Sequence, residues 1–184
     1  MDSHGNIVIM KQVAAAIALF LVVHSPSPTN AMILDSPSKL VDGVCKKTLN
    51  YADCVSAIGS ASASDLKTLA RVSLERAVSN TTNSKDYIDK LAKDKSTAPA
   101  LIRALKECVS DYESSAASFK SAKMEIDEDI SSANYDAKVA GDGADSCDTS
   151  LKATKKDVPS VKARNYYVKL YSNIGFVITE QLGG

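Results

Sequence analysis

From Ser64 onward, apolar and small residues recur along the chain at alternating steps of three and four positions. Such spacing places side chains on one face of a helix. The first run comprises Leu66, Ala70, Ser73, Ala77, Asn80, Ser84, Tyr87 and Leu91. The second run comprises Leu101, Leu105, Cys108, Tyr112, Ser115, Phe119, Ala122 and Ile126. Pro99 stands where the second helix would start, a position that tolerates the missing N–H of proline.

Two further runs complete the pattern. The third comprises Ile130, Ala133, Ala137, Ala140, Ala144, Cys147, Leu151 and Thr154. The fourth extends from about residue 161 to 182 and comprises Tyr167, Val168, Leu170, Tyr171, Ile174, Val177, Ile178 and Leu182. The alanines of the third run, with Gly141 and Gly143, would let that helix approach its neighbours closely. Four amphipathic helices joined by short links predict an all-α fold, an up-and-down four-helix bundle over residues 63–184.

The four cysteines add a second constraint. Cys108 and Cys147 fall on the inward lines of the second and third predicted helices, and antiparallel packing would bring them within bonding range. A single helix through Cys45 and Cys54 would separate their Cα atoms by about 13 Å, beyond the ~7 Å limit of a disulfide. Pairing between these two therefore requires the chain to turn, which makes residues 32–62 a helical hairpin ahead of the bundle. Four cysteines allow three connectivities, so cross-pairing between the two sets is also open.

The N-terminal segment predicts export. Lys11 precedes an apolar run, residues 13–23, that is too short for the ~20 residues needed to cross a bilayer but typical of a secretory signal. Cleavage after Ala31 suits the small-residue rule, with cleavage after Ser25 as the alternative, so we interpret residues 1–31 as a signal peptide. No second long apolar run follows, and we expect no membrane span. Export implies an oxidising compartment, where an even number of cysteines indicates two disulfides.

Charge and composition exclude several function classes. The chain has 22 basic and 22 acidic residues, so it has no excess charge to attract nucleic acid or an anionic membrane. Its only histidines, His4 and His24, precede the expected cleavage point, which leaves no imidazole for a Ser-His pair, a histidine base or a zinc site. We therefore expect no enzyme activity, no metal and no cofactor. An enzyme that uses carboxylates alone is the weakest alternative, because no predicted helix places two carboxylates on its inward line.

Three segments carry a family resemblance. They are CKKTLNYADC (45–54), ALKECVSDY (104–112) and DGADSCD (142–148). Together with the spacing of the four cysteines, they resemble the plant invertase and pectin methylesterase inhibitor family over essentially the whole chain after the signal peptide. The resemblance implies a four-helix bundle with an N-terminal helical hairpin, one disulfide inside the hairpin and one that links helices two and three. The implied pairs are Cys45–Cys54 and Cys108–Cys147.

The same resemblance implies inhibition of an enzyme. Family members are exported to the plant cell wall (the apoplast) or the vacuole, where they bind pectin methylesterase or acid invertase and block the substrate cleft. Some invertase inhibitors carry a Pro-Lys-Phe motif at the start of helix three, whereas this chain reads DEDISSANYDAK over residues 127–138. That difference favours pectin methylesterase as the target, with invertase as the alternative. A small-ligand carrier or allergen-like bundle with an internal cavity is a further alternative, and the oligomeric state is open.

Surface positions opposite the inward lines are the candidate partner-binding residues. They are Lys106, Ser110, Glu113, Lys138, Asp142 and Asp145. An ordinary solvated helix surface is the competing interpretation of each. The acidic run over residues 125–129 could supply carboxylates for acid–base chemistry or a cation site, but we interpret it as a solvated turn between helices two and three. Asn80, Thr81 and Thr82 form an N-glycosylation sequon in mid-helix, near the inward face.

Overall fold

The computed structural model describes residues 38–184, which contain seven α-helices and no strand. The helices are α1 (Lys39–Cys45), α2 (Tyr51–Ile58), α3 (Leu66–Lys93), α4 (Pro99–Glu125), α5 (Ile130–Val139), α6 (Asp142–Ala153) and α7 (Pro159–Gln181). The predicted signal peptide, residues 1–31, lies outside the described residues. The two short helices α1 and α2 form the predicted hairpin, and the longer helices follow it.

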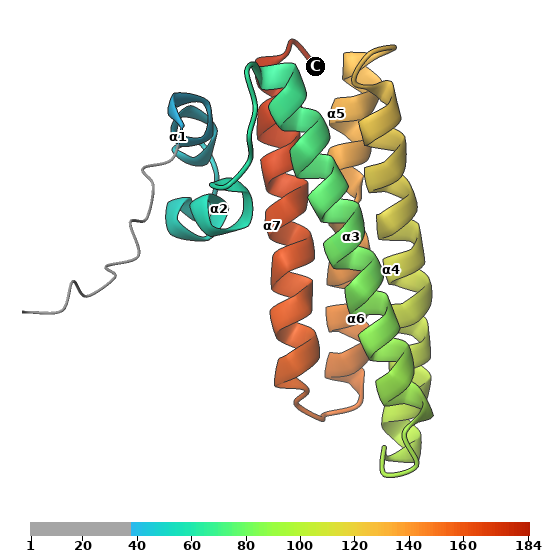
Figure 1. The fold of residues 1–184 in the computed structure, drawn as a ribbon. Coiled ribbons are helices and arrows are strands. Elements are labelled where there is room, and N and C mark those ends of the chain that lie inside the picture. Colours follow the sequence, from blue (N-terminus) through green and yellow to red (C-terminus); the bar gives the residue numbers. More distant parts are fainter. Residues whose placement is uncertain (1–37) are drawn as a thin grey trace, which may run out of the picture. The chain divides into compact units, whose positions relative to one another are not determined.

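Helices α3, α4, α7 and the consecutive pair α5–α6 form a four-helix bundle (Figure 1). Helix α3 packs against α4 and α7, and the α5–α6 pair packs against both α4 and α7. Successive members are joined by short links, so neighbours in the bundle run in opposite directions. Apolar residues of the hairpin and of all the bundle helices belong to one buried core. The all-α, up-and-down prediction is confirmed.

Local sequence signals set the starts of the long helices. The Asp65 carboxylate accepts a hydrogen bond of 2.8 Å from the backbone N–H of Thr68 at the start of α3. Asp129 plays the same part for α5, where its carboxylate accepts from two backbone N–H groups. Pro99 and Pro159 stand in the first turns of α4 and α7, where the missing N–H of proline costs no hydrogen bond.

The third predicted helix differs from the structure. The pattern predicts one helix over residues 130–154, but the chain breaks into α5 and α6 at Ala140 and Gly141. The hydroxyl of Ser172, on α7, donates a 2.9 Å hydrogen bond to the carbonyl oxygen of Lys138. A side chain that enters the hydrogen-bond ladder in this way interrupts a helix. Glycine at 141 leaves room for this hydrogen bond, because a Cβ there would lie 2.9 Å from that same hydroxyl oxygen.

Both disulfides implied by the family resemblance are present. Cys45–Cys54 joins α1 to α2 with Cα atoms 5.4 Å apart. Cys108–Cys147 joins α4 to α6 with Cα atoms only 4.5 Å apart. Gly143, one turn before Cys147, explains how the two helices come so close. A Cβ on this glycine would lie 2.4 Å from the carbonyl oxygen of Asp111 on α4, so the predicted role of Gly143 in close packing is confirmed.

The hairpin explains why the apolar face of α7 is so broad. Helices α1 and α2 pack on α7 in addition to its bundle neighbours, so the C-terminal half of α7 is buried on almost every side. Leu170, Ile174 and Val177 are accordingly buried. The pattern also predicts Tyr167 on this buried face, but its side chain is 40% exposed. Tyr167 lies in the N-terminal half of α7, where its tyrosine neighbour Tyr166 is equally exposed.

Substitution of Gly143 tests the close approach of α4 and α6. We expect Gly143→Ala to lower the free energy of unfolding by about 1–3 kcal/mol, because the new methyl group forces apart backbone that has no room to yield. The urea midpoint of the oxidised protein measures this. Gly43→Ala is the matched control. No heavy atom lies within 4 Å of the Cβ position of Gly43, so alanine there is expected to stabilise α1 by ~0.5–1 kcal/mol. Equal midpoints for the two variants would contradict the packing argument.

Candidate functional site

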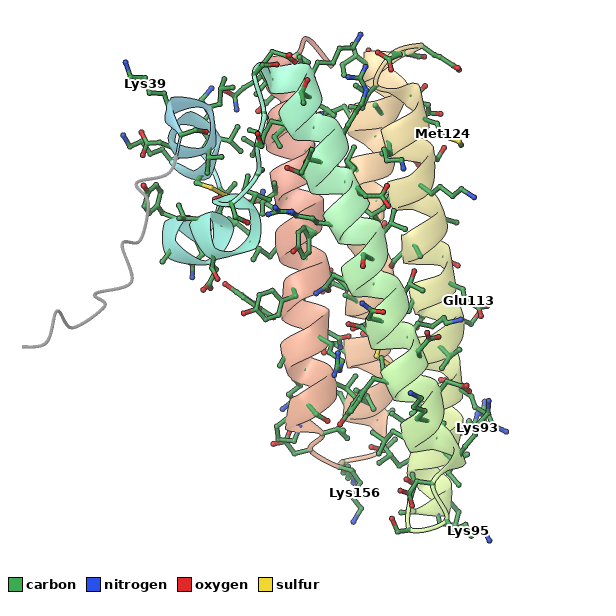
Figure 2. All side chains as sticks on the ribbon, viewed as in Figure 1. Lys39, Lys93, Lys95, Glu113, Met124 and Lys156 are labelled. Carbon is green, nitrogen blue, oxygen red and sulfur yellow. A yellow bond between two sulfur atoms is a disulfide. The ribbon has the colours of Figure 1, made fainter. Side chains whose placement is uncertain are left out.

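The six candidate partner-binding residues are all exposed. Three of them lie on α4, Lys138 lies on α5, and the two aspartates lie on α6. Helices α4 and α5–α6 are neighbours, so the candidates occupy adjacent outer surfaces of the bundle. They do not form one cluster. Glu113 points away from α4 (Figure 2) and lies 3.6 Å from the ammonium of Lys85 on α3, whereas Asp145 lies 3.1 Å from the ammonium of Lys169 on α7.

Shallow depressions on the outer surfaces of single helices include four of the candidates. Lys106 and Ser110 line one on α4, together with Pro99 and other α4 side chains, with a volume of about 490 Å³. Asp142 and Asp145 line another on α6, of about 500 Å³. Both are open to solvent. These depressions lend no support to a ligand carrier, which requires an enclosed cavity between helices.

A buried polar network supports the candidate surface from inside, and the sequence analysis did not identify it. The hydroxyl of Tyr112 donates to Oδ1 of Asn165 at 2.5 Å, and Nδ2 of Asn165 donates to Asp148 at 2.6 Å. Lys169 donates to Asp148 at 2.9 Å and also reaches Asp145. Burial, together with the charge of Asp148, raises the pKa of Tyr112, which keeps its hydroxyl a neutral donor. The network therefore links α4, α6 and α7 and holds the side chain of Asp145 toward α7.

The acidic run over residues 125–129 has structural roles. Asp127 pairs with Arg71 and with Lys67, both on α3. The hydrogen bonds from these two cations hold the pKa of Asp127 at about 2. Asp129 caps α5, and its hydrogen bonds to Ser132 lower the pKa of its carboxyl. Residues 126–129 form the turn between α4 and α5, where the sequence predicted a turn, and the pairing of Asp127 and the capping by Asp129 hold it in place. Among residues 38–184, no group of three or more His, Cys, Asp or Glu residues is placed to hold a metal ion.

Exposed tyrosines are the second feature that the sequence analysis did not single out. Tyr51, Tyr166 and Tyr167 are between 40% and 43% exposed, and Tyr135 on α5 is 65% exposed. The hydroxyl of Tyr51 donates to Asp42 at 3.0 Å, and the hydroxyl of Tyr166 donates to Asp53. The helical periodicity of the sequence could have identified Tyr135 as exposed, because it places this residue opposite the buried line of α5.

The glycosylation sequon lies in the middle of α3. Asn80 is half-buried, and its Oδ1 atom is buried without a hydrogen-bond partner in the structure. Thr81, the next residue of the sequon, is fully buried. The position agrees with the predicted inward orientation, and occupancy of the sequon stays a prediction.

The carboxyl group of Glu125, the last residue of α4, has a raised pKa. Its Oε1 atom accepts a 3.4 Å hydrogen bond from Ser121, but its Oε2 atom is buried without a partner. Burial, followed by the nearby carboxylate of Asp136 on α5, raises the pKa of Glu125 above its ordinary value of 4.5. The helix dipole acts in the same direction, because the C-terminus of α4 disfavours a negative charge. The folded protein therefore binds this proton more tightly than the unfolded chain does.

The raised pKa of Glu125 predicts how the stability of the protein changes with pH. As the pH rises through the raised pKa, the folded state must ionise Glu125 beside Asp136, so stability falls relative to a variant that carries no charge there. We expect Glu125→Gln to raise the melting temperature at pH 7, with the gain shrinking to zero as the pH falls below about 4.5. Melting curves between pH 4 and pH 8 measure this. Glu128→Gln removes an exposed charge from the same turn and serves as the control; a gain independent of pH would contradict the assignment.

Comparison with known proteins gives the context for these features. A profile described as "Plant invertase/pectin methylesterase inhibitor" matches residues 39–174. A crystal structure of a mutant form of a pectin methylesterase inhibitor from Arabidopsis is similar, with 25% identity and a TM-score of 0.68, and the match covers 74% of this chain and 93% of that one. A crystal structure of a pectin methylesterase inhibitor from Arabidopsis thaliana matches with 26% identity and a TM-score of 0.60, over 80% of this chain and 98% of that one.

Among curated proteins, none shows significant similarity to this chain. No helix within residues 38–184 is long and apolar enough to cross a membrane. The profile match spans most of the described residues and includes all four cysteines and both disulfides. The chain belongs to the plant invertase/pectin methylesterase inhibitor family.

Proposed function

We propose that this protein is a secreted inhibitor that binds pectin methylesterase and blocks the entrance to its substrate cleft. Membership of a family of invertase and pectin methylesterase inhibitors supports the inhibitory role. The observation that favours pectin methylesterase is that the two similar crystal structures described above are of pectin methylesterase inhibitors. The signal peptide predicted at residues 1–31 would deliver the protein to the cell wall, or to the vacuole, where such an enzyme would be met.

The architecture suits inhibition by occlusion. One disulfide closes the hairpin, the other links α4 to α6 within the bundle, and one continuous core joins the hairpin to the bundle. A surface that is rigid before binding loses little conformational entropy when it docks. Occlusion makes and breaks no covalent bond, so the proposal assigns no catalytic residue and no cofactor to this chain.

The outer surfaces of α4 and of α5–α6 are the proposed docking side. This assignment uses the six candidate residues, all of which are exposed and polar: Lys106, Ser110, Glu113, Lys138, Asp142 and Asp145. Most of the exposed side chains named here are polar, which suits contact with a polar cleft. The disulfide between α4 and α6 fixes their relative position, which is what a surface built from two helices requires.

Invertase is the second candidate target, because the description of the family names both enzymes. Residues 127–138 lack the Pro-Lys-Phe motif of some invertase inhibitors, and we therefore place invertase second.

Paired activity assays test the proposal. The oxidised, secreted protein is mixed at equimolar, micromolar concentration with a plant pectin methylesterase and, separately, with a plant acid invertase. We expect the esterase to lose most of its activity while the invertase keeps its own. The same protein after reduction and alkylation of its cysteines is the control, because loss of the Cys108–Cys147 link should release α4 from α6 and weaken inhibition. Loss of invertase activity alone would replace the proposed target, and loss of neither would remove the proposed function.

A further inference from the structure

Three exposed side chains form a line on the outer surface of α5 and α6. They are Tyr135, Lys138 and Asp142, which we call the outer stripe. Their spacing of three and then four residues places them on one side of a helix. The break between α5 and α6 does not interrupt the line, because Ala140 and Gly141 both keep helical backbone angles. At ~1.5 Å per residue the stripe is about 10 Å long.

The polar groups of the stripe make no side-chain hydrogen bond or ion pair within residues 38–184. No hydrogen bond involves the hydroxyl of Tyr135, and Asp142 takes part in no ion pair there. Lys138 makes no ion pair either, but its ammonium lies over the ring of Phe176, 5.7 Å from the ring centroid, in a cation–π contact. Several other exposed groups of these kinds are paired in this chain, although the hydroxyl of Tyr167 makes no hydrogen bond among the described residues either. The hydroxyl of Tyr51 is bound to Asp42, and Asp145 is paired with Lys169.

The backbone beneath the stripe is held from inside. Asn134, next to Tyr135, donates from Nδ2 to the carbonyl oxygen of Phe176 at 3.2 Å and to the hydroxyl of Thr179 at 2.9 Å, both on α7. The carbonyl oxygen of Lys138 accepts from Ser172, also on α7, at 2.9 Å. Helix α5 is therefore fixed to α7 at two successive turns, which positions the outward side chains without involving them.

The surroundings make Tyr135 prominent. Its ring is 65% exposed, more than that of any other tyrosine in residues 38–184. The neighbouring outward positions on α5 carry small side chains such as Ser131 and Ser132. Tyrosine is enriched among the residues that dominate binding energy at protein interfaces, and such residues are typically surrounded by contacts of low energy. A rigid aromatic ring with a free hydroxyl can bury a large area at low entropic cost.

We propose that Tyr135 is the principal anchor by which this protein holds its target enzyme, with Lys138 and Asp142 setting the orientation of the complex. The inference rests on the proposed function and specifies the partner's surface: an apolar pocket that accepts the tyrosine ring, a carboxylate opposite Lys138 and a basic group opposite Asp142. Complementary charges on the two sides would exclude an enzyme surface that presents a base to Lys138 or an acid to Asp142.

Three substitutions test the inference against the same pectin methylesterase. Tyr135→Ala is expected to raise the inhibition constant about 30-fold, the loss expected when an anchoring tyrosine is truncated. Tyr167→Ala is the matched control, because it also removes an exposed tyrosine, but from α7 and outside the stripe. This variant should have an inhibition constant within about twofold of that of the unchanged protein, because a residue outside the interface contributes little to the binding energy. Asp142→Lys should slow association and change its dependence on salt. Melting temperatures of all variants establish that each is folded.

The outcomes separate the inference from the proposed function. If the unchanged protein fails to inhibit the esterase, the proposed function is overturned and the inference with it. If the unchanged protein inhibits and Tyr135→Ala inhibits equally well, the inhibitory function stands and Tyr135 is not the anchor. A large loss for Tyr167→Ala with none for Tyr135→Ala would also overturn the inference and place the docking surface on the N-terminal half of α7.

Discussion

The close approach of α4 and α6 is the constraint on which the rest of this structure depends. It rests on Gly143, where a side chain would collide with the backbone of Asp111, and on the Cys108–Cys147 disulfide, whose Cα atoms are 4.5 Å apart. Two helices this close favour small side chains between them, and Ala144, next to Gly143 on α6, is fully buried. In the chain-entropy model, closing the loop between these cysteines stabilises the fold by roughly 3–4 kcal/mol.

Most of the fold follows from the sequence because its determinants are local. Helical periodicity identifies the bundle helices, and the prolines at 99 and 159 mark two of their starts. The break between α5 and α6 could not be predicted in this way, because it depends on the hydroxyl of Ser172 from another helix. The exposure of Tyr167 could not be predicted either, because periodicity does not show which positions of α7 the hairpin covers. Contacts between distant parts of the chain therefore account for both differences.

For the candidate surface too, local properties could be predicted from the sequence and contacts between helices could not. Exposure of the six candidate residues follows from helical phase alone, and the structure places all six at the surface. The ion-pair partners of these residues cannot be predicted from the helical periodicity. Glu113 lies near Lys85 and Asp145 near Lys169 because of which helices become neighbours, and the network through Asn165 is assembled from three helices. A polar residue on the apolar line of α7, at position 165 between Val161 and Val168, is the one signal of that network in the sequence.

The distinction between paired and free charges matters most for a protein that acts by binding. An exposed ion pair contributes about 0.2–1 kcal/mol, so a residue such as Asp145 must give up a similar amount before it can pair with another protein. Asp142 and Lys138 have no such pair to break within residues 38–184, and Tyr135 has no hydroxyl partner to lose. A complementary group on an enzyme would therefore pair at these positions without first breaking an ion pair. A surface whose backbone is already fixed loses little conformational entropy on binding. If its outward polar groups also have no ion pair, they remain available to pair with another protein. The surface of α5 and α6 has both properties.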